Sequence, residues 1–162
     1  MNSYRRLARD NSNAFTPYVA HISNNLAILL NETSRTEEAE AFYREALDNY
    51  RRLARDNPAV YEPDTSMTCN NLAILLKDKN RTEEAEAFYR EALDGYRRLA
   101  QDNPDVFAPY AADICYNFGE FERDRGDMNA AKKYFEEALA LYEKFPRLAD
   151  DAQECRDILK EL

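Results

Sequence analysis

Apolar residues recur every three or four positions along most of the chain, with charged residues between them. In one segment Ile22, Leu26, Leu29 and Leu30 follow this spacing, and a second stripe runs from Ala39 to Leu53. This spacing places side chains on one face of an α-helix. The pattern therefore predicts amphipathic helices that pack their apolar faces together. With only three glycines and six prolines, the composition disfavours the many tight turns of a β-sandwich or barrel.

The helical pattern repeats with a step of 46 residues. The motif Tyr-Arg-Arg-Leu-Ala begins at positions 4, 50 and 96, and a looser third copy follows two nearly identical ones. Two blocks recur without change: residues 24–30 return as 70–76, and residues 35–48 return as 81–94. Within each copy the pattern predicts two helices. Because a fixed period of this size is typical of repeat architectures, we expect repeats at about residues 17–57, 63–103 and 109–145.

Local signals suggest where these helices begin and end. Capping-box spacing marks the start of each second helix, and prolines mark the connectors between repeats. The capping boxes are Ser34 with Glu37 and Asn80 with Glu83; the connectors are residues 57–63 and 103–109. Inside the connectors, Val60, Tyr61, Val106 and Phe107 are expected to fold back as apolar plugs over the helix ends. Charged pairs four residues apart, such as Glu40 with Arg44, are expected on a solvated outer face.

Small and large residues alternate at fixed places in every copy. They are Leu26, Ala27, Leu30, Ala39, Tyr43 and Ala46 in the first, Leu72, Ala73, Leu76, Ala85, Tyr89 and Ala92 in the second, and Phe118, Gly119, Ala131, Phe135 and Ala138 in the third. This arrangement resembles the tetratricopeptide repeat, in which small residues lie where the two helices of a pair cross closely. The usual unit has 34 residues. The longer second helix here is similar to that of kinesin light chains and their bacterial relatives.

The resemblance implies an all-α fold, a right-handed α-solenoid of antiparallel helix pairs. We expect residues 1–162 to form one solenoid of about three pairs. A half-repeat helix at residues 3–11 would precede the pairs, and a capping helix at residues 147–162 would follow them, because an apolar stripe and charged residues alternate there.

Charge and composition exclude several functions. The chain has 31 acidic and 22 basic residues, a formal net charge of −9, which argues against a nucleic-acid backbone as the main ligand. No apolar run is long enough to span a membrane, and the N-terminus lacks an apolar signal region. We therefore expect no nucleic-acid partner, no membrane partner and a cytoplasmic location.

The sequence also lacks the constellations that carry chemistry. It has no glycine-rich phosphate loop and no metalloprotease or hydrolase motif, and His21 is its one histidine. The three cysteines, Cys69, Cys115 and Cys155, form no CxxC motif, so we expect reduced thiols, with Cys69 and Cys115 as small core residues. These features predict a protein that is not an enzyme and that uses no cofactor or metal.

Candidate binding residues lie on the face of each first helix that its buried stripe leaves open, which lines the concave groove in this family. They are Asn24, Asn25, Ile28 and Asn31 in the first copy, Met67, Asn70, Asn71, Ile74 and Lys77 in the second, and Tyr116, Asn117 and Arg123 in the third. By resemblance, Asn25, Asn71 and Asn117 contact the main chain of a bound peptide, which an amide can read through both donor and acceptor. Alternatively, the asparagines bond to the neighbouring helix and hold the repeats in register.

These observations favour a non-catalytic module that binds an extended peptide or protein segment in the concave groove. Apolar floor residues and the acidic Asp113, Glu120 and Asp124 favour a segment with apolar side chains and a basic end. A second hypothesis is a structural scaffold, a natural fragment or an engineered repeat, whose exposed terminal helices stack head to tail into a homo-oligomer. A third is a consensus-derived repeat without a native ligand.

Overall fold

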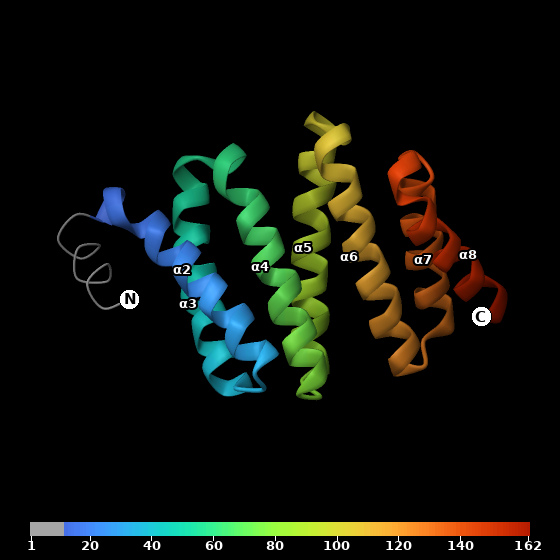
Figure 1. Ribbon diagram of the computed structural model, residues 1–162, viewed down its shortest axis with the longest axis horizontal. Coiled ribbons are helices and arrows are strands. Elements are labelled where there is room, and N and C mark those ends of the chain that lie inside the picture. Colours follow the sequence, from blue (N-terminus) through green and yellow to red (C-terminus); the bar gives the residue numbers. More distant parts are fainter. Residues whose placement is uncertain (1–11) are drawn as a thin grey trace. The chain divides into compact units, whose positions relative to one another are not determined.

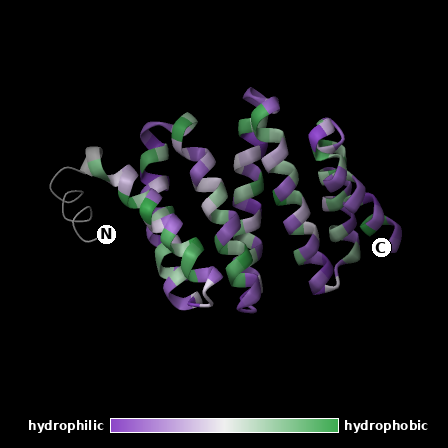
Figure 2. Cartoon of the chain, in the orientation of Figure 1, coloured by the Kyte–Doolittle hydropathy of each residue, from purple (hydrophilic) through white to green (hydrophobic). Residues whose placement is uncertain are grey.

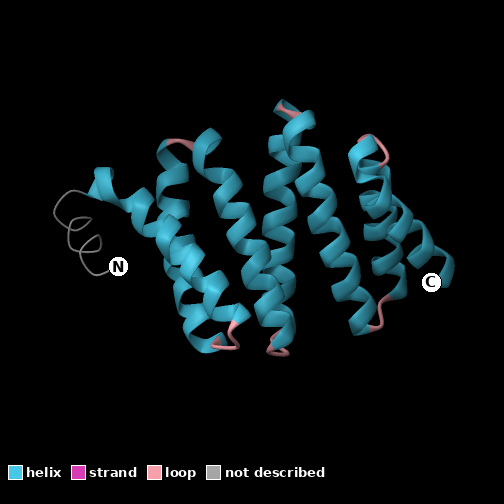
Figure 3. Ribbon diagram, in the orientation of Figure 1, coloured by secondary structure: helices cyan, strands magenta, loops and turns pink. Residues whose placement is uncertain are grey.

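The computed structural model describes the backbone of residues 12–162 and the side chains of residues 15–162. Within this part of the chain all regular secondary structure is helical (Figure 3), which confirms the all-α prediction. The helices are α2 Ser12–Glu32, α3 Thr36–Asp56, α4 Pro58–Asp78, α5 Thr82–Asp102, α6 Pro104–Arg125, α7 Met128–Tyr142, the 3₁₀ turn η1 Pro146–Leu148, and α8 Ala149–Glu161. The half-repeat helix predicted for residues 3–11 lies outside the described residues.

The chain divides into two compact units, the first ending at Phe88 and the second running from Tyr89 to Leu162. In the first unit α3 packs against both α2 and α4, and in the second α7 packs against both α6 and α8 (Figure 1). Helices that follow one another in the chain therefore pack side by side, as in a tetratricopeptide-repeat solenoid. The assignment of all residues to one right-handed solenoid stays a prediction.

Hydrophobic and hydrophilic residues alternate along the ribbons (Figure 2). Helices α3 and α5 are strongly amphipathic, whereas α4 is buried on more than one side. The small residues predicted at the helix crossings are buried: Ala27 and Ala73 have no exposed surface, and Gly119 takes the equivalent place in α6. The three cysteines are free and buried, as predicted. In α8, Ala152 and Cys155 are buried, and the helix packs against α7, as expected for the predicted capping helix.

One core prediction is wrong for the first helix. Leu29 was expected on the buried stripe, but its side chain is 55% exposed, whereas Leu30 beside it is buried. At the equivalent positions Leu75 of α4 and Phe121 of α6 are buried. The difference arises because α4 packs on α3, the helix before it, whereas within the described residues α2 has no preceding helix.

The connector prediction holds for the break between helices but not for its length, because only Asn57 and Asn103 of the two connectors lie outside a helix. Helix α4 begins at Pro58 and contains Pro63, and α6 begins at Pro104 and contains Pro109. Proline suits the first helical position, where its missing N–H leaves no bond unmade, and a proline one turn later removes a single bond. Among the predicted plugs, Val60 and Val106 are exposed, whereas Tyr61 packs against Ala20, Ala46 and Tyr50, and Phe107 against Tyr96.

The predicted capping boxes are not formed. Ser34 and Asn80 have φ angles of 60° and 57°, which place them in the left-handed turn that ends the preceding helix. The next residue closes that turn, since the N–H of Arg35 donates to the Leu30 carbonyl oxygen at 2.8 Å. In the third copy the equivalent turn uses Gly126, and Asp127 then caps α7 by accepting from the Ala130 N–H at 3.0 Å.

Candidate functional site

In the first unit, the two adjacent asparagines of α2 lie in different surroundings. Asn24 is partly buried, and its amide oxygen lies 3.2 Å from the Thr68 hydroxyl of α4. Asn25 is exposed, and its amide Nδ2 lies 3.0 Å from Nε2 of His21, one turn earlier on the same helix. The first asparagine therefore joins two helices, while the second faces solvent.

The same division recurs on α4. Asn70 is buried, with 6% of its surface exposed, and Asn71 beside it is partly exposed. In α6 of the second unit, Tyr116 takes the place of the first asparagine, and the partly exposed Asn117 takes that of the second. The packing role considered for the whole asparagine set is therefore seen at Asn24, and Asn70 leaves little surface for a ligand.

The remaining predicted groove residues of the first unit are all partly exposed, so part of each side chain is accessible. They are Ile28 and Asn31 on α2, and Met67, Ile74 and Lys77 on α4. Since α2 and α4 both pack on α3, the first unit carries all nine of its predicted residues on two helices that share a neighbour.

In the second unit the other predicted residues make internal contacts. The Tyr116 hydroxyl donates to Glu154 of α8 at 2.7 Å, and its ring meets Phe135 edge-on, 5.6 Å between centroids. Arg123 donates to Glu120 at 2.6 Å. Burial and the neighbouring Glu154 raise the pKa of Tyr116, so this hydroxyl stays protonated and acts as a donor.

The acidic side chains of this unit are partly engaged as well. The Asp113 carboxylate accepts from the Tyr142 hydroxyl at 2.8 Å, and burial raises the pKa of Asp113 despite that bond. Asp124 is exposed at the end of α6. Of the three acidic residues predicted at the end of the binding surface, Glu120 and Asp113 are therefore hydrogen-bonded within the unit, while Asp124 is exposed.

The first unit also has a pocket that the sequence did not indicate as a site. It has a volume of about 310 Å³ and lies between α2, the C-terminal half of α3 and the start of α4. Its lining residues are Pro17, Tyr18, His21, Ile22, Tyr50, Tyr61 and Asp64. A signal was available in the repeat alignment, because Asp64 stands where the third copy has Tyr110.

We call the surface of α2 and α4 around Asn25 and Asn71 the asparagine face. The pocket adjoins it at two points. His21 lines the pocket and contacts Asn25, and Thr68 donates to the Asp64 carbonyl oxygen at 2.7 Å while lying next to Asn24. The pocket is therefore continuous with the surface on which Asn25 is exposed.

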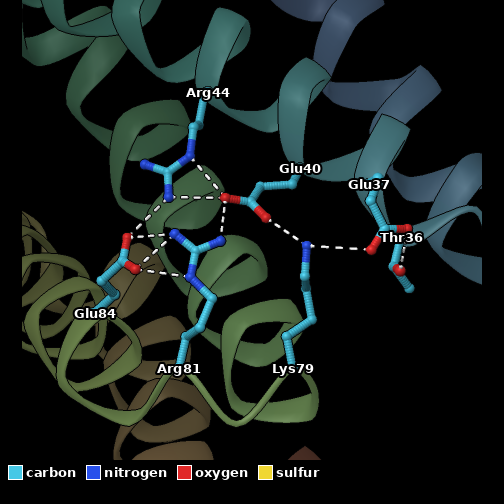
Figure 4. Close-up of polar contacts among 7 residues, drawn as sticks. All are labelled: Thr36, Glu37, Glu40, Arg44, Lys79, Arg81 and Glu84. Carbon is cyan, nitrogen blue, oxygen red and sulfur yellow. Dashed lines mark hydrogen bonds and ion pairs between the residues drawn. The ribbon is translucent and has the colours of Figure 1, made fainter.

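A separate cluster of charges joins α3, the turn after α4 and the start of α5 (Figure 4). The Glu40 carboxylate accepts from Lys79 at 2.7 Å, Arg81 at 2.6 Å and Arg44 at 3.0 Å, and both arginines also bind Glu84. Burial disfavours the charged form of Glu40, but the three donors outweigh it and lower its pKa to about 2. The predicted Glu40–Arg44 pair is confirmed, but Glu40 is only 12% exposed instead of solvated. Since each cation already has a carboxylate partner, the cluster fastens helices and is not a ligand site.

Metal and membrane features were searched in the same part of the chain. No cluster of three or more histidine, cysteine, aspartate or glutamate side chains suited to a metal occurs among the described residues. None of the described helices combines the length and the apolar character needed to cross a membrane.

Comparisons with known proteins agree with this architecture. A family model described as tetratricopeptide repeat matches residues 18–98, and a second with the same description matches residues 112–145. No curated protein sequence matches the chain significantly.

Two solved structures share the fold. One is the kinesin-light-chain-like protein BtubC (BKLC) from P. vanneervenii, with 24% identity and a TM-score of 0.67 over 88% of this chain and 62% of that one. The other is the N-terminal domain of stress-induced protein-1 (STI-1) from C. elegans, with 17% identity and a TM-score of 0.61 over 88% of this chain and 98% of that one. Tetratricopeptide repeats are usually non-catalytic and typically serve as protein–protein interaction modules. The chain belongs to the tetratricopeptide-repeat family.

Proposed function

We propose that this protein binds an extended protein segment through Asn25 and Asn71 of the first unit and Asn117 of the second. The observation that supports this most directly is the division within each asparagine pair. Asn24 and Asn70 pack inside the unit, where they can hold neighbouring helices in register. Asn25 is exposed, and Asn71 and Asn117 are partly exposed. An exposed amide offers both a donor and an acceptor, so it can bond to peptide main chain whatever the side chains of that peptide are.

The neighbouring residues favour a segment with apolar side chains. Ile28 and Ile74 lie one turn beyond the asparagine pairs and are only partly buried, so they offer apolar surface beside the exposed amides. Met67 adds a flexible, polarizable contact. Main-chain recognition by the amides together with this apolar surface would hold an extended chain without demanding one exact sequence.

The test compares two triple variants in a capture experiment. Asn25→Ala, Asn71→Ala and Asn117→Ala together should abolish capture of partners from a lysate of the source organism, read by mass spectrometry. The matched control replaces three asparagines that are exposed elsewhere, Asn57, Asn103 and Asn129, by alanine. Helicity and thermal melting should be nearly unchanged in the first triple variant, because its three side chains are not buried. Equal capture by both variants, or equal loss, would remove the asparagine face from the proposal.

A second function, self-association, is favoured by Leu29. This side chain is 55% exposed on α2, while its counterpart Leu75 is fully buried against a neighbouring helix. Burying one leucine contributes about 1.5–3 kcal/mol, so the face around Leu29 would gain from a second copy. Light scattering over a concentration series should then show a mass that rises with concentration and that falls in Leu29→Asp. A monomer at every concentration would exclude this second function.

A further inference from the structure

The pocket beside the asparagine face lies where the repeats differ, most plainly at the position of Asp64. In the second unit Tyr110 stacks on Tyr96, with ring centroids 5.3 Å apart and planes 16° apart. The position equivalent to Tyr110 in the preceding copy is Asp64, and the position equivalent to Tyr96 is Tyr50. A carboxylate therefore stands where the third copy has an aromatic ring, and a pocket lies beside Tyr50, whose own side chain is buried.

The walls of this space are aromatic. Tyr18, Tyr50 and Tyr61 come from three different helices, and Pro17 and Ile22 complete an apolar surround. Tyr50 and Tyr61 are held in place by the cluster of Ala20 and Ala46, so two of the walls are packed before any ligand arrives. Aromatic faces carry a negative quadrupole, which attracts a cation placed over the ring.

Asp64 gives the pocket its charge. No lysine or arginine lines the pocket within the described residues, and His21 is the one basic side chain that does. Burial raises the pKa of Asp64, and the nearby His21 opposes that rise. A carboxylate beside three tyrosines, with no lysine or arginine in the described lining, is complementary to a positively charged side chain.

We propose that this pocket binds the side chain of an arginine in the bound segment. The guanidinium plane would stack on the more exposed rings of Tyr18 and Tyr61 and donate to the Asp64 carboxylate, while its apolar stem would lie against Pro17 and Ile22. A volume of about 310 Å³ accommodates such a side chain. The inference rests on the proposed function, because the pocket adjoins the exposed Asn25 through His21.

The pocket can be tested without knowing the partner. The probe is N-acetyl-L-argininamide, titrated into the full chain while NMR signals of labelled tyrosines are followed. The neutral analogue N-acetyl-L-citrullinamide has nearly the same shape and serves as the comparison. We expect the arginine probe to shift tyrosine signals and to bind about tenfold more tightly than the citrulline probe, as for a charge-assisted hydrogen bond.

Two substitutions of Asp64, with Asp78→Asn as a control, then locate the site. Asp64→Asn should reduce the affinity of the arginine probe about tenfold, whereas Asp78→Asn, at an exposed position on the same helix, should not change it. Asp64→Tyr recreates the residue of the third copy, so its ring should stack on Tyr50, close the pocket and abolish binding without loss of thermal stability. Equal binding of both probes, or unchanged binding in a folded Asp64→Tyr variant, would overturn the proposal.

The same variants separate this inference from the proposed function. If the pocket is as proposed but the asparagine face is not a binding surface, the arginine probe still binds and the asparagine triple variant still captures partners. If the proposed function holds and the pocket does not take arginine, capture depends on Asn25, Asn71 and Asn117 while the two probes bind alike.

Discussion

The ring of Phe135 lies against the backbone of Gly119 where α7 crosses α6. A Cβ atom added at Gly119 would be 3.0 Å from both the Cε1 and Cζ atoms of that ring. Phe135 has no exposed surface, and the Tyr116 ring packs edge-on with it. The ring therefore has little room to withdraw, and the two helices approach more closely here than an alanine would allow.

Gly119→Ala should therefore destabilise the second unit. Replacing glycine by alanine inside a helix normally stabilises it by about 1 kcal/mol, whereas overpacking a tight core costs about 1–3 kcal/mol. We expect a net loss of about 1 kcal/mol, measured as a lower midpoint of urea unfolding. In a Phe135→Leu background, Gly119→Ala should reduce the free energy of unfolding by less, because the smaller side chain makes room. Simple additivity of the two changes would contradict the proposed clash.

The left-handed turn before α7 allows a test that the repeats themselves suggest. Gly126 has a φ angle of 84°, and its counterpart in the preceding copy, Asn80, has 57°. Gly126→Asn should be nearly neutral, since asparagine tolerates this conformation, whereas Gly126→Ala should cost about 1 kcal/mol or more. No side chain lies within 4 Å of the added Cβ, so backbone strain alone should separate the two variants in thermal melting. Equal melting temperatures would argue against this explanation.

Much of the fold could be predicted because the repeat brings the same residues to the same places three times. The buried small residues at Ala27, Ala73 and Gly119 followed directly from it. The error at Leu29 arose because periodicity identifies an apolar stripe but does not reveal whether another helix covers it. The connector at Pro63 was predicted too long for a different reason. Proline disfavours helix interiors but is tolerated in the early turns, where few hydrogen bonds depend on it.

The binding surface was harder to predict than the fold. The sequence indicated the doubled asparagines but could not separate Asn24 from Asn25, because their roles depend on the neighbouring helix that only Asn24 reaches. The pocket was missed because comparing the copies drew attention to identities. It is a difference between them, Asp64 against Tyr110, that opens the space.

The charge cluster around Glu40 should stabilise the first unit. Glu40→Gln keeps the shape of the side chain but leaves Lys79, Arg81 and Arg44 around a neutral group. Because Glu40 is only 12% exposed, we expect a loss of about 1–2 kcal/mol in the free energy of unfolding. Glu38→Gln is the matched control, since Glu38 is 54% exposed and pairs only with Arg35 on the surface. It should change stability by less than about 0.5 kcal/mol, and a similar effect of both substitutions would contradict the role of Glu40.

Acid should remove the advantage that Glu40 confers. Its folded-state pKa of about 2 is below the ordinary value of 4.5, so the unfolded chain binds the proton more readily. The stabilisation from Glu40 is therefore complete above about pH 4.5 and is lost as the pH falls through the interval down to about 2. Burial raises the pKa of Asp64 and of Asp113, so their protonation on acidification has the opposite sign and obscures the slope for the whole protein.

For this reason the quantity to measure is the difference in unfolding free energy between the natural chain and Glu40→Gln. The contributions of Asp64 and Asp113 are the same in both proteins and cancel in this difference. Urea titrations at about pH 7, 5, 4 and 3 should give a difference that is constant at the two higher values and then shrinks steadily. In Glu38→Gln the difference should stay small, because Glu38 is exposed and its partner is a solvated surface arginine. A difference that stayed constant down to about pH 3 would mean that Glu40 is not held charged by the three cations around it, whatever their distances in the folded protein.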